Sequence, residues 1–194
     1  MGFFRTAFYM PVVMSAVVVG MIWTNLLDSA GLVNSVLKAL KIISKPIPFL
    51  TDRWGVLFSS MFVTIWLGLG YYMVIYLTAL ANIDESLYEA ASLDGAGPVR
   101  QFIYVTMPGV RSTMMLIMML STIAAFRVFN EIYVLTNGSA GPGGMDMTMS
   151  MLIKREGTGI QARTGYASAI SIVVLVIVGV MLIVRQILQK RGED

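Results

Sequence analysis

The residues best suited to recognising a partner lie in a polar interval, residues 84–111, which separates two long apolar runs. Within it, the carboxylate of Glu89 is followed by two small residues, Ala90 and Ala91. Small side chains permit close approach and a carboxylate pairs with basic residues, so a helix with this surface is suited to insertion into a groove of another protein. The alternative is an ordinary helical connection between two apolar segments, since small residues are frequent in helices.

The residue types that the sequence lacks exclude most soluble-enzyme chemistry. There is no histidine, the commonest general base and metal ligand, and no cysteine for disulfides or thiolate metal sites. The pattern G-x-x-x-x-G-K-S/T is also absent, so the chain has no P-loop of its own for nucleotide. We therefore expect no catalytic residues, no metal site and no enzyme activity in this chain.

The composition predicts a membrane protein. Of 194 residues, 57% are hydrophobic and 13% are charged, whereas soluble domains carry about 25% charged residues. A membrane span needs about 20 mostly apolar residues, and such runs cover residues 7–27, 55–81, 112–135 and 166–184. Backbone polar groups inside a bilayer must be paired within the segment, so each span is expected to be a helix. The predicted fold class is all-α: a polytopic bundle of transmembrane helices.

The charges of the chain fit membrane flanks better than a nucleic-acid surface. The net charge of +3 comes from basic residues scattered over loops and span ends. They divide as six and seven between the two sides of a four-span bundle, so the positive-inside bias leaves the orientation open. In the first loop, an amphipathic stretch at residues 32–40 is expected to lie along the membrane surface.

The polar interval predicts a helix, a tight turn and a second helix outside the bilayer. Asp84 is a good N-cap, and Ser86 and Glu89 have the spacing of a capping box. Gly95 follows as a helix stop, because glycine accepts positive φ at little cost. The second helix is expected over residues 98–107, from a proline suited to the first helical position to another proline that ends it.

Three residues predict local features of the spans. Pro11 predicts a kink in the first span, because proline removes a helical hydrogen bond. Gly68 and Gly70 in the second span predict close contact with another helix, the small-residue packing that membrane proteins use.

The polar interval resembles the EAA motif of ABC-transporter permease subunits. The residues that match this motif are Glu89, Ala90, Ala91, Gly95, Ile103 and Pro108. One departure is Met107, where the motif usually has leucine, and this change is conservative in volume. The neighbouring residues 94–98 and the segment 133–138 resemble the carbohydrate-import branch, the maltose-type permeases. The resemblance extends over essentially the whole chain.

The resemblance implies a subunit of a bacterial or archaeal importer in the cytoplasmic membrane, with the type I permease fold and one permease domain over residues 1–194. The loop 82–111 would hold the cytoplasmic coupling helix, which sits in a cleft of an ATPase subunit. Both termini would be cytoplasmic. The implied partners are ABC ATPase subunits, a second permease subunit, an extracytoplasmic solute-binding protein and the lipid bilayer. ATP and Mg²⁺ would belong to the ATPase, and no cofactor is implied for this chain.

The family pattern also leaves two questions open. Permeases of this branch typically have six core spans, and the first apolar run of this chain corresponds to the third of them. Either it is a truncated or misassigned reading frame, or the other helices come from a separate polypeptide. A truncated, non-transporting fragment or assembly partner is therefore one alternative to an importer subunit. A secondary transporter or channel subunit is another, and it would depend on an ion gradient rather than an ATPase.

The solute implied by the resemblance is a sugar, an oligosaccharide, a polyol or a sugar phosphate, and five residues are candidates for its path. Arg127 and Glu131 are four apart on one face of the third span, where charge faces a polar interior or pairs internally. Asn130 would bond either a sugar hydroxyl or a neighbouring helix. Trp66 and Tyr71 would stack on a sugar or serve as packing residues.

Overall fold

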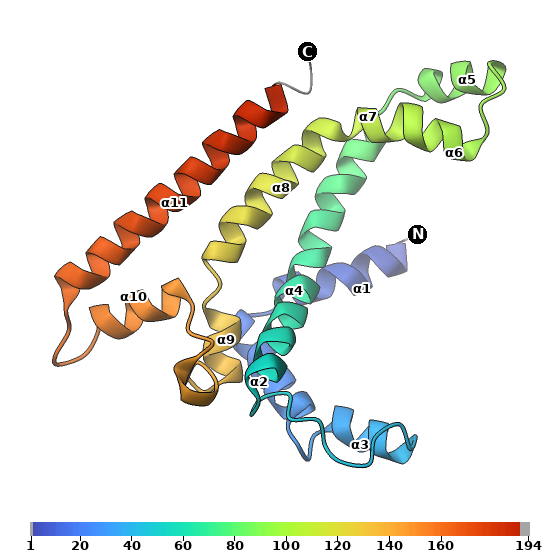
Figure 1. Cartoon of the computed structure of the whole chain (residues 1–194). Helices are drawn as coiled ribbons and strands as arrows, with labels where there is room; N and C mark the ends of the chain where they lie inside the picture. The colour runs from blue at the N-terminus through green and yellow to red at the C-terminus, as the bar shows by residue number, and fades with distance from the viewer. Residues whose placement is uncertain (1, 191–194) are drawn as a thin grey trace. The chain divides into compact units, whose positions relative to one another are not determined.

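Helices make up all the regular structure of the described residues. The computed structural model describes residues 2–190, which contain no strand (Figure 1). The longer elements are α1 (Gly2–Val13), α2 (Ala16–Leu27), α3 (Leu32–Ala39), α4 (Arg53–Ala81), α5 (Glu85–Leu93), α8 (Arg111–Phe126), α10 (Met149–Gly157) and α11 (Thr164–Lys190). The shorter ones are α6 (Pro98–Gln101), the π-helical turn η1 (Phe102–Thr106), α7 (Met107–Gly109), α9 (Asn130–Leu135) and the 3-10 turn η2 (Pro142–Gly144). The predicted all-α class is confirmed.

The described chain forms two compact units, each built from two separate stretches. The first unit holds residues 2–13 and 67–121, and the second holds residues 14–66 and 122–190. The first contains the polar interval, and the second contains α3, α9, α10 and α11. The single domain predicted over residues 1–194 stays a prediction, and residues 1 and 191–194 of that range lie outside the described residues.

Several helices have the length and composition of membrane spans. Within residues 2–190 these are Ala16–Ala39, which combines α2 and α3, Arg53–Ala81 and Thr164–Ile187. The number rises from three to four if the bent pair Pro98–Gly109 and Arg111–Phe126, which meet at 62°, forms one span. Helices α4 and α11 thus cover the predicted spans 55–81 and 166–184.

The first predicted span, residues 7–27, is not one helix. Helix α1 ends at Val13 and α2 begins at Ala16, and Ser15 between them has extended backbone with φ −61° and ψ 132°. Pro11 lacks the N–H that would bond to the carbonyl four residues earlier, which weakens the last turn of α1. The expected kink is therefore a complete break. The apolar pattern continues through it unchanged, so the pattern alone gave no sign of a break.

The third predicted span, residues 112–135, is also interrupted. Helix α8 ends at Phe126, and α9 begins only at Asn130. Phe129 between them has φ −141° and ψ −59°, which is outside the helical region. Residues 112–135 are thus a long helix followed by a short one, and the two do not share a continuous face.

Helices α1 and α4 approach closely within the first unit, and Gly70 permits it. A Cβ atom at Gly70 would clash with the backbone carbonyl of Phe8 and would lie 2.9 Å from Val12 Cγ2. The predicted close contact is confirmed for Gly70. Among the described residues Gly68 has no such neighbour, since a Cβ atom there would meet only the ring of Tyr72 on the same helix, at 3.3 Å.

The loop between α3 and α4 is held by one buried amide. The Asn34 side chain is fully buried and donates to the carbonyls of Asp28, at 3.1 Å, and Ile47, at 3.0 Å. Its oxygen accepts from the N–H of Ile47 at 2.8 Å. One side chain of α3 thus ties the turn before this helix to the loop that follows it.

Replacing Asn34 by alanine should destabilise this loop by about 2 kcal/mol, because it leaves the Ile47 N–H and two carbonyls without their partner. Faster hydrogen exchange across residues 28–52 would show it. Ser35→Ala is the matched control, since Ser35 is exposed on the same helix. Equal exchange in the two variants would contradict the role of Asn34.

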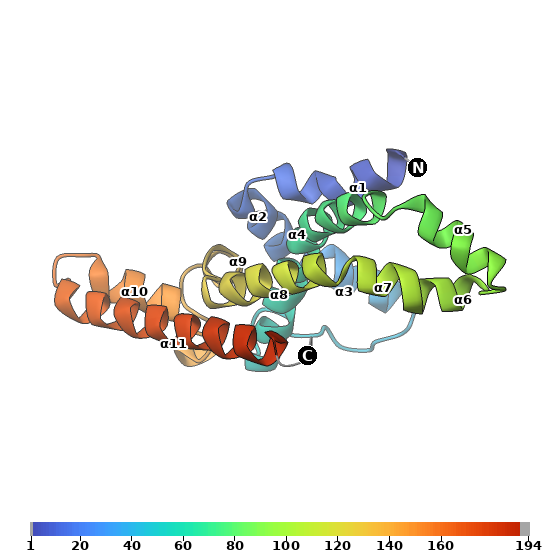
Figure 2. The ribbon, with the colours of Figure 1, turned by 90° about the horizontal axis from the view of Figure 1, so that it is seen from above.

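A small core joins α9 to the loop and helix that follow it. Ile132, Ala140 and Met151 form a buried cluster in the second unit. Thr136 supports it, since its hydroxyl donates to the carbonyl of Ile132 at 2.6 Å and accepts from the N–H of Ala140 at 3.1 Å. Helix α10 then packs along α11 (Figure 2). The contact of Met151 in α10 with Ile132 in α9 fixes the position of α10 against α9.

A carboxylate with one buried oxygen lies in the same loop. Asp146 Oδ2 is buried and has no hydrogen-bond partner among the described residues. Burial raises the pKa of Asp146, the positive charge of Arg53 opposes the rise, and the negative charge of Asp52 adds to it. Because the folded chain holds this proton more tightly than the unfolded chain, stability is highest below the ordinary pKa of 3.8 and falls as pH rises through the raised value.

Asp146→Asn should remove that pH dependence and raise the thermal midpoint at neutral pH, while leaving it unchanged below about pH 4. Thermal unfolding of both proteins across this range measures the effect. Asp94→Asn is the control, because Asp94 is exposed and its loss removes the same charge. Parallel pH profiles for wild type and Asp146→Asn would contradict the prediction.

Candidate functional site

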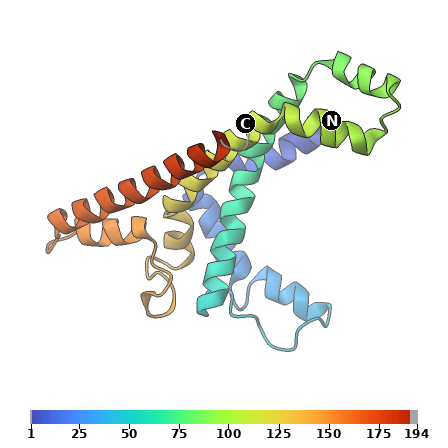
Figure 3. The ribbon, with the colours of Figure 1, turned by 45° about the horizontal axis from the view of Figure 1, so that its top comes forward.

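The polar hairpin, residues 84–109, begins with a capped helix (Figure 3). Asp84 Oδ1 accepts a hydrogen bond from the Ser86 N–H at 2.9 Å, so the predicted N-cap is confirmed. This hydrogen bond lowers the pKa of Asp84. The predicted capping box of Ser86 and Glu89 is wrong, because α5 starts at Glu85 and Ser86 lies inside its first turn.

Gly95 ends α5 in a left-handed conformation, with φ +72°. The N–H of Ala96 bonds to the carbonyl of Ala91 at 2.9 Å, and the N–H of Gly95 bonds to that of Ser92 at 3.0 Å. This pair of bonds is the Schellman arrangement, which satisfies the last carbonyls of a helix. The predicted helix stop at Gly95 is confirmed.

Side-chain hydrogen bonds tie the two arms of the polar hairpin together. Gln101 Nε2 donates to Ser92 Oγ at 2.8 Å and to the carbonyl of Ala96 at 3.2 Å. Further along, the hydroxyls of Tyr88 and Thr106 lie 2.9 Å apart. The hairpin is thus braced at its tip and along its length.

Pro108 does not end the second arm as expected. The helix passes through it to Gly109 by way of the π-helical turn η1, in which the Met107 N–H bonds to the carbonyl of Phe102. A π turn before proline shifts the hydrogen-bond pattern, so the missing proline N–H leaves no gap within a regular helix. The chain bends instead after Gly109, by 62°.

The polar hairpin presents small and apolar side chains to its surroundings. Glu89, Ala90 and Gly95 are exposed and Ala91 is half-buried, while Ile103 and Pro108 are exposed on the second arm. The most exposed apolar side chains are Leu93 (89%), Tyr104 (76%) and Val99 (69%). Exposed apolar groups on a capped and braced polar element are typical of a protein docking surface.

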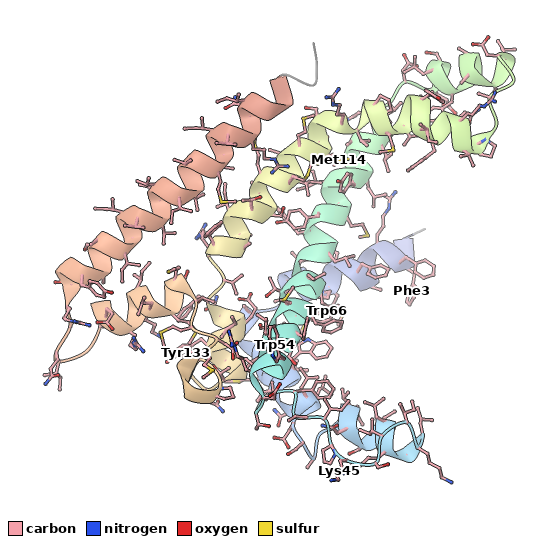
Figure 4. All side chains as sticks on the ribbon, viewed as in Figure 1. Phe3, Lys45, Trp54, Trp66, Met114 and Tyr133 are labelled. Atoms are coloured by element: carbon pink, nitrogen blue, oxygen red, sulfur yellow. The ribbon has the colours of Figure 1, made fainter. Side chains whose placement is uncertain are left out.

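The aromatic candidates Trp66 and Tyr71 pack against other aromatic rings. Trp66, labelled on α4 in Figure 4, meets Trp23 edge to face with ring centroids 5.5 Å apart. Tyr71 meets Tyr72 in the same manner at 5.3 Å. Trp66 lies in the second unit and Tyr71 in the first, and neither is among the residues that line the cavities described in that unit. These contacts favour the packing interpretation.

Arg127 and Glu131 do not form the pair that the sequence suggested. Arg127 lies just after α8 and is exposed, whereas Glu131 lies in α9 and is half-buried. The break between the two helices separates them, and no ion pair joins them in the described part of the chain. The expectation of one shared helical face is wrong.

The third polar candidate, Asn130, lines a cavity of about 620 Å³ within the second unit. We name it the α2–α9 cavity, and its lining residues are Val17, Met21, Thr24, Asn25, Phe129, Asn130, Tyr133, Val134, Asn137 and Lys154. Its walls come from α2, α9 and α10 and from the residues next to α9. Close packing fixes the first two walls, since a Cβ atom at Gly20 would lie 2.8 Å from the Val134 side chain.

The sequence did not reveal the cation and aromatic rings of this cavity. The Lys154 ammonium lies 3.9 Å from the ring centroid of Tyr133 and 4.9 Å from that of Phe129. The two rings stack with centroids 5.0 Å apart and 26° between their planes, and Figure 4 labels Tyr133. The four-residue spacing of Phe129 and Tyr133 was a signal for their pairing, but nothing local pointed to Lys154.

Together these features define an all-α protein with helices of membrane-span length, a braced polar hairpin and a largely apolar cavity, and comparison with known proteins identifies its family. The chain belongs to the binding-protein-dependent transport system inner membrane components, which it matches over residues 1–193. The predicted membership among ABC-importer permeases is confirmed. The chain is thus a multi-pass protein of the cytoplasmic membrane.

Relatives include permeases of carbohydrate systems. The chain is 34% identical to the probable ABC transporter permease protein YurN of Bacillus subtilis, covering 99% of this chain and 65% of the relative. It is 33% identical to the lactose transport system permease protein LacF of Rhizobium radiobacter, over 93% of this chain and 60% of the relative. This chain therefore spans less than two thirds of the length of either relative.

Solved structures share the fold. A bacterial ABC transporter for import of the acidic polysaccharide alginate has a chain that superposes with a TM-score of 0.78 at 24% identity, covering 96% of this chain and 64% of that one. The same kind of transporter, in complex with a periplasmic protein bound to an alginate pentasaccharide, gives a TM-score of 0.81. The importer-permease fold expected from the motif is confirmed.

Proposed function

We propose that this chain is a permease subunit of an ATP-driven importer that receives a sugar or an oligosaccharide from an extracytoplasmic binding protein. The family supports the transport role. Relatives named for lactose, arabinooligosaccharides and diacetylchitobiose support a carbohydrate solute. The observation that carries the proposal is the polar hairpin, whose exposed Glu89 and Ala90 and sharp turn at Gly95 suit a groove in another protein.

The proposed partner at the hairpin is an ABC ATPase on the cytoplasmic side. ATP and Mg²⁺ would bind that ATPase and supply the driving force, and this chain, which lacks a P-loop, would not hydrolyse ATP. Glu89 would pair with a basic residue of the groove, and Ala90 and Ala91 would allow close approach. A second permease subunit and the lipid bilayer would cover the apolar faces of the spans.

Mechanical coupling follows from how the hairpin is braced. When the ATPase closes, a loose loop would absorb the displacement, but the Gln101–Ser92 and Tyr88–Thr106 bonds hold the two arms together. The motion would then pass into α4, a continuous helix of 29 residues that is roughly 43 Å long. Such rigid-element motion is a common basis of switching between two states.

The solute path through this chain remains a proposal. Asn130 is its best-supported member because it lines the α2–α9 cavity. Arg127 and Glu131 lie beside that region of the sequence and would contribute at its edge. Trp66 and Tyr71 would shape the path through their packing.

Purification of the tagged full chain from its native membranes tests this function. We expect a P-loop ATPase and a second permease subunit to copurify, and the complex to hydrolyse ATP. A well-expressed chain that purifies with a permease but no ATPase would indicate an assembly partner. A chain that carries solute down an ion gradient without any ATPase would indicate a secondary transporter, and either result would overturn the proposal.

A further inference from the structure

We propose that the α2–α9 cavity is a subsite for an anionic sugar, a ring that carries a carboxylate or a phosphate group. This inference rests on the proposed role in sugar import and adds a class of solute to it. The cavity lies wholly within one compact unit, so its residues are placed relative to one another without reference to the rest of the chain.

The cavity offers a face for a sugar ring. Phe129 and Tyr133 stack at 5.0 Å, and both rings line the cavity. Aromatic rings bind the apolar C–H face of a sugar, and the Tyr133 hydroxyl adds a polar tip. Because Gly20 and Val134 hold α2 against α9, the two helices that line the cavity are packed together before a solute arrives.

The cavity also offers free polar groups around the rings. The side-chain amides of Asn130 and Asn137 have no hydrogen bond within residues 2–190. Asn25 donates to the carbonyl of Met21 at 2.8 Å, which leaves its oxygen free. Amides that both donate and accept are suited to the hydroxyl groups of a sugar.

The positive charge of Lys154 favours an anionic sugar over a neutral one. Lys154 is the one charged residue in the lining, and it forms no ion pair in the part of the chain that is described. The nearest acidic residue along α10, Glu156, is engaged by Arg155 and Arg163 instead. An ammonium group in a cavity without a carboxylate attracts an anionic solute.

The position of Lys154 links this charge to the aromatic face. Its ammonium covers the Tyr133 ring, where a sugar would stack. A carboxylate or phosphate forms a charge-assisted hydrogen bond with ammonium, which is stronger than a cation–π contact at an exposed site. An anionic sugar therefore draws Lys154 off the ring and gains the ring face, whereas a neutral sugar must displace the ammonium without compensation.

Binding to the full chain in lipid nanodiscs tests the proposal. The probes are trigalacturonate, its neutral methyl ester and galactose 1-phosphate, measured by titration calorimetry. We expect the wild type to bind trigalacturonate or galactose 1-phosphate roughly tenfold more tightly than the ester. The preferred anion identifies the acidic group as carboxylate or phosphate.

Variants at position 154 test whether Lys154 causes the preference for the anion. Lys154→Gln should abolish the preference for the anion, while Lys154→Arg should keep it. Arg155→Gln is the matched control, because it removes the same charge one residue further on, outside the lining. Equal binding of anion and ester, an unchanged preference in Lys154→Gln, or no binding to folded chain would overturn the subsite.

The experiments distinguish failure of the importer role from failure of the anionic-sugar subsite. Copurification of an ATPase without anion preference would leave the importer role intact and remove the subsite. Anion preference without an ATPase would do the reverse.

Discussion

Replacing Gly95 by valine is expected to reduce the ATPase that copurifies with this chain by roughly tenfold. Gly95 has φ +72°, and a β-branched residue avoids this region. The substitution would therefore open the turn that orients α5 against the second arm. The strain is purely conformational, because no atom lies within 4 Å of a Cβ atom built there.

Two substitutions separate this effect from a general loss of folding. Gly95→Asn should keep most of the ATPase, since asparagine tolerates the left-handed region. Gly97→Ser should also keep it, because Gly97 has φ −70°, occupies the N-cap of α6 and has open space around it. Normal copurification with Gly95→Val would show that the turn does not position the docking surface.

Gly70→Ala should destabilise the first unit by about 1–3 kcal/mol, the usual cost of overpacking. The added methyl group would meet the backbone carbonyl of Phe8, which cannot rotate away as a side chain would. Helices α1 and α4 would have to separate. A lower midpoint of thermal unfolding for the detergent-solubilised chain measures the effect.

Gly68→Ala provides the matched control two residues earlier on the same helix. Its methyl group would meet only the Tyr72 ring at 3.3 Å, and that side chain can shift. In a helix interior alanine is also favoured over glycine. A thermal midpoint for Gly70→Ala as high as that of Gly68→Ala would contradict the close contact between α1 and α4.

Local rules explain what the sequence predicted well. The cap at Asp84 and the stop at Gly95 depend on backbone groups within a few residues, so short patterns are enough to identify them. Long apolar runs likewise predicted α4 and α11. Resemblance to the family motif then predicted an ABC ATPase as partner, which rules for caps, turns and hydropathy do not indicate.

Breaks within apolar runs and tertiary contacts escaped prediction. The gap at Ser15 lies among apolar residues, where hydropathy does not change. The gap at Phe129 lies beside Arg127, Asn130 and Glu131, polar residues that a continuous helix could equally carry. Continuation of the helix through Pro108 depends on a π turn that no proline rule indicates. Lys154 reaches the rings of Phe129 and Tyr133 only because the core around Met151 places α10 there.

Cross-linking from Leu93 tests the central claim most directly. Leu93 is 89% exposed on α5 and takes no part in the bonds that brace the hairpin. The chain has no native cysteine, so Leu93→Cys carries a single reactive thiol. Leu32→Cys is the control: Leu32 is 61% exposed on α3, and the membrane span α4 lies between α3 and the hairpin in the chain, so we expect the two on opposite sides of the membrane.

The account predicts that Leu93→Cys, cross-linked in native membranes, captures a P-loop ATPase identified by mass spectrometry, and that Leu32→Cys does not. Capture of no ATPase by a well-expressed Leu93→Cys chain, or labelling of Leu93→Cys by a membrane-impermeant maleimide from outside the cell, would contradict it.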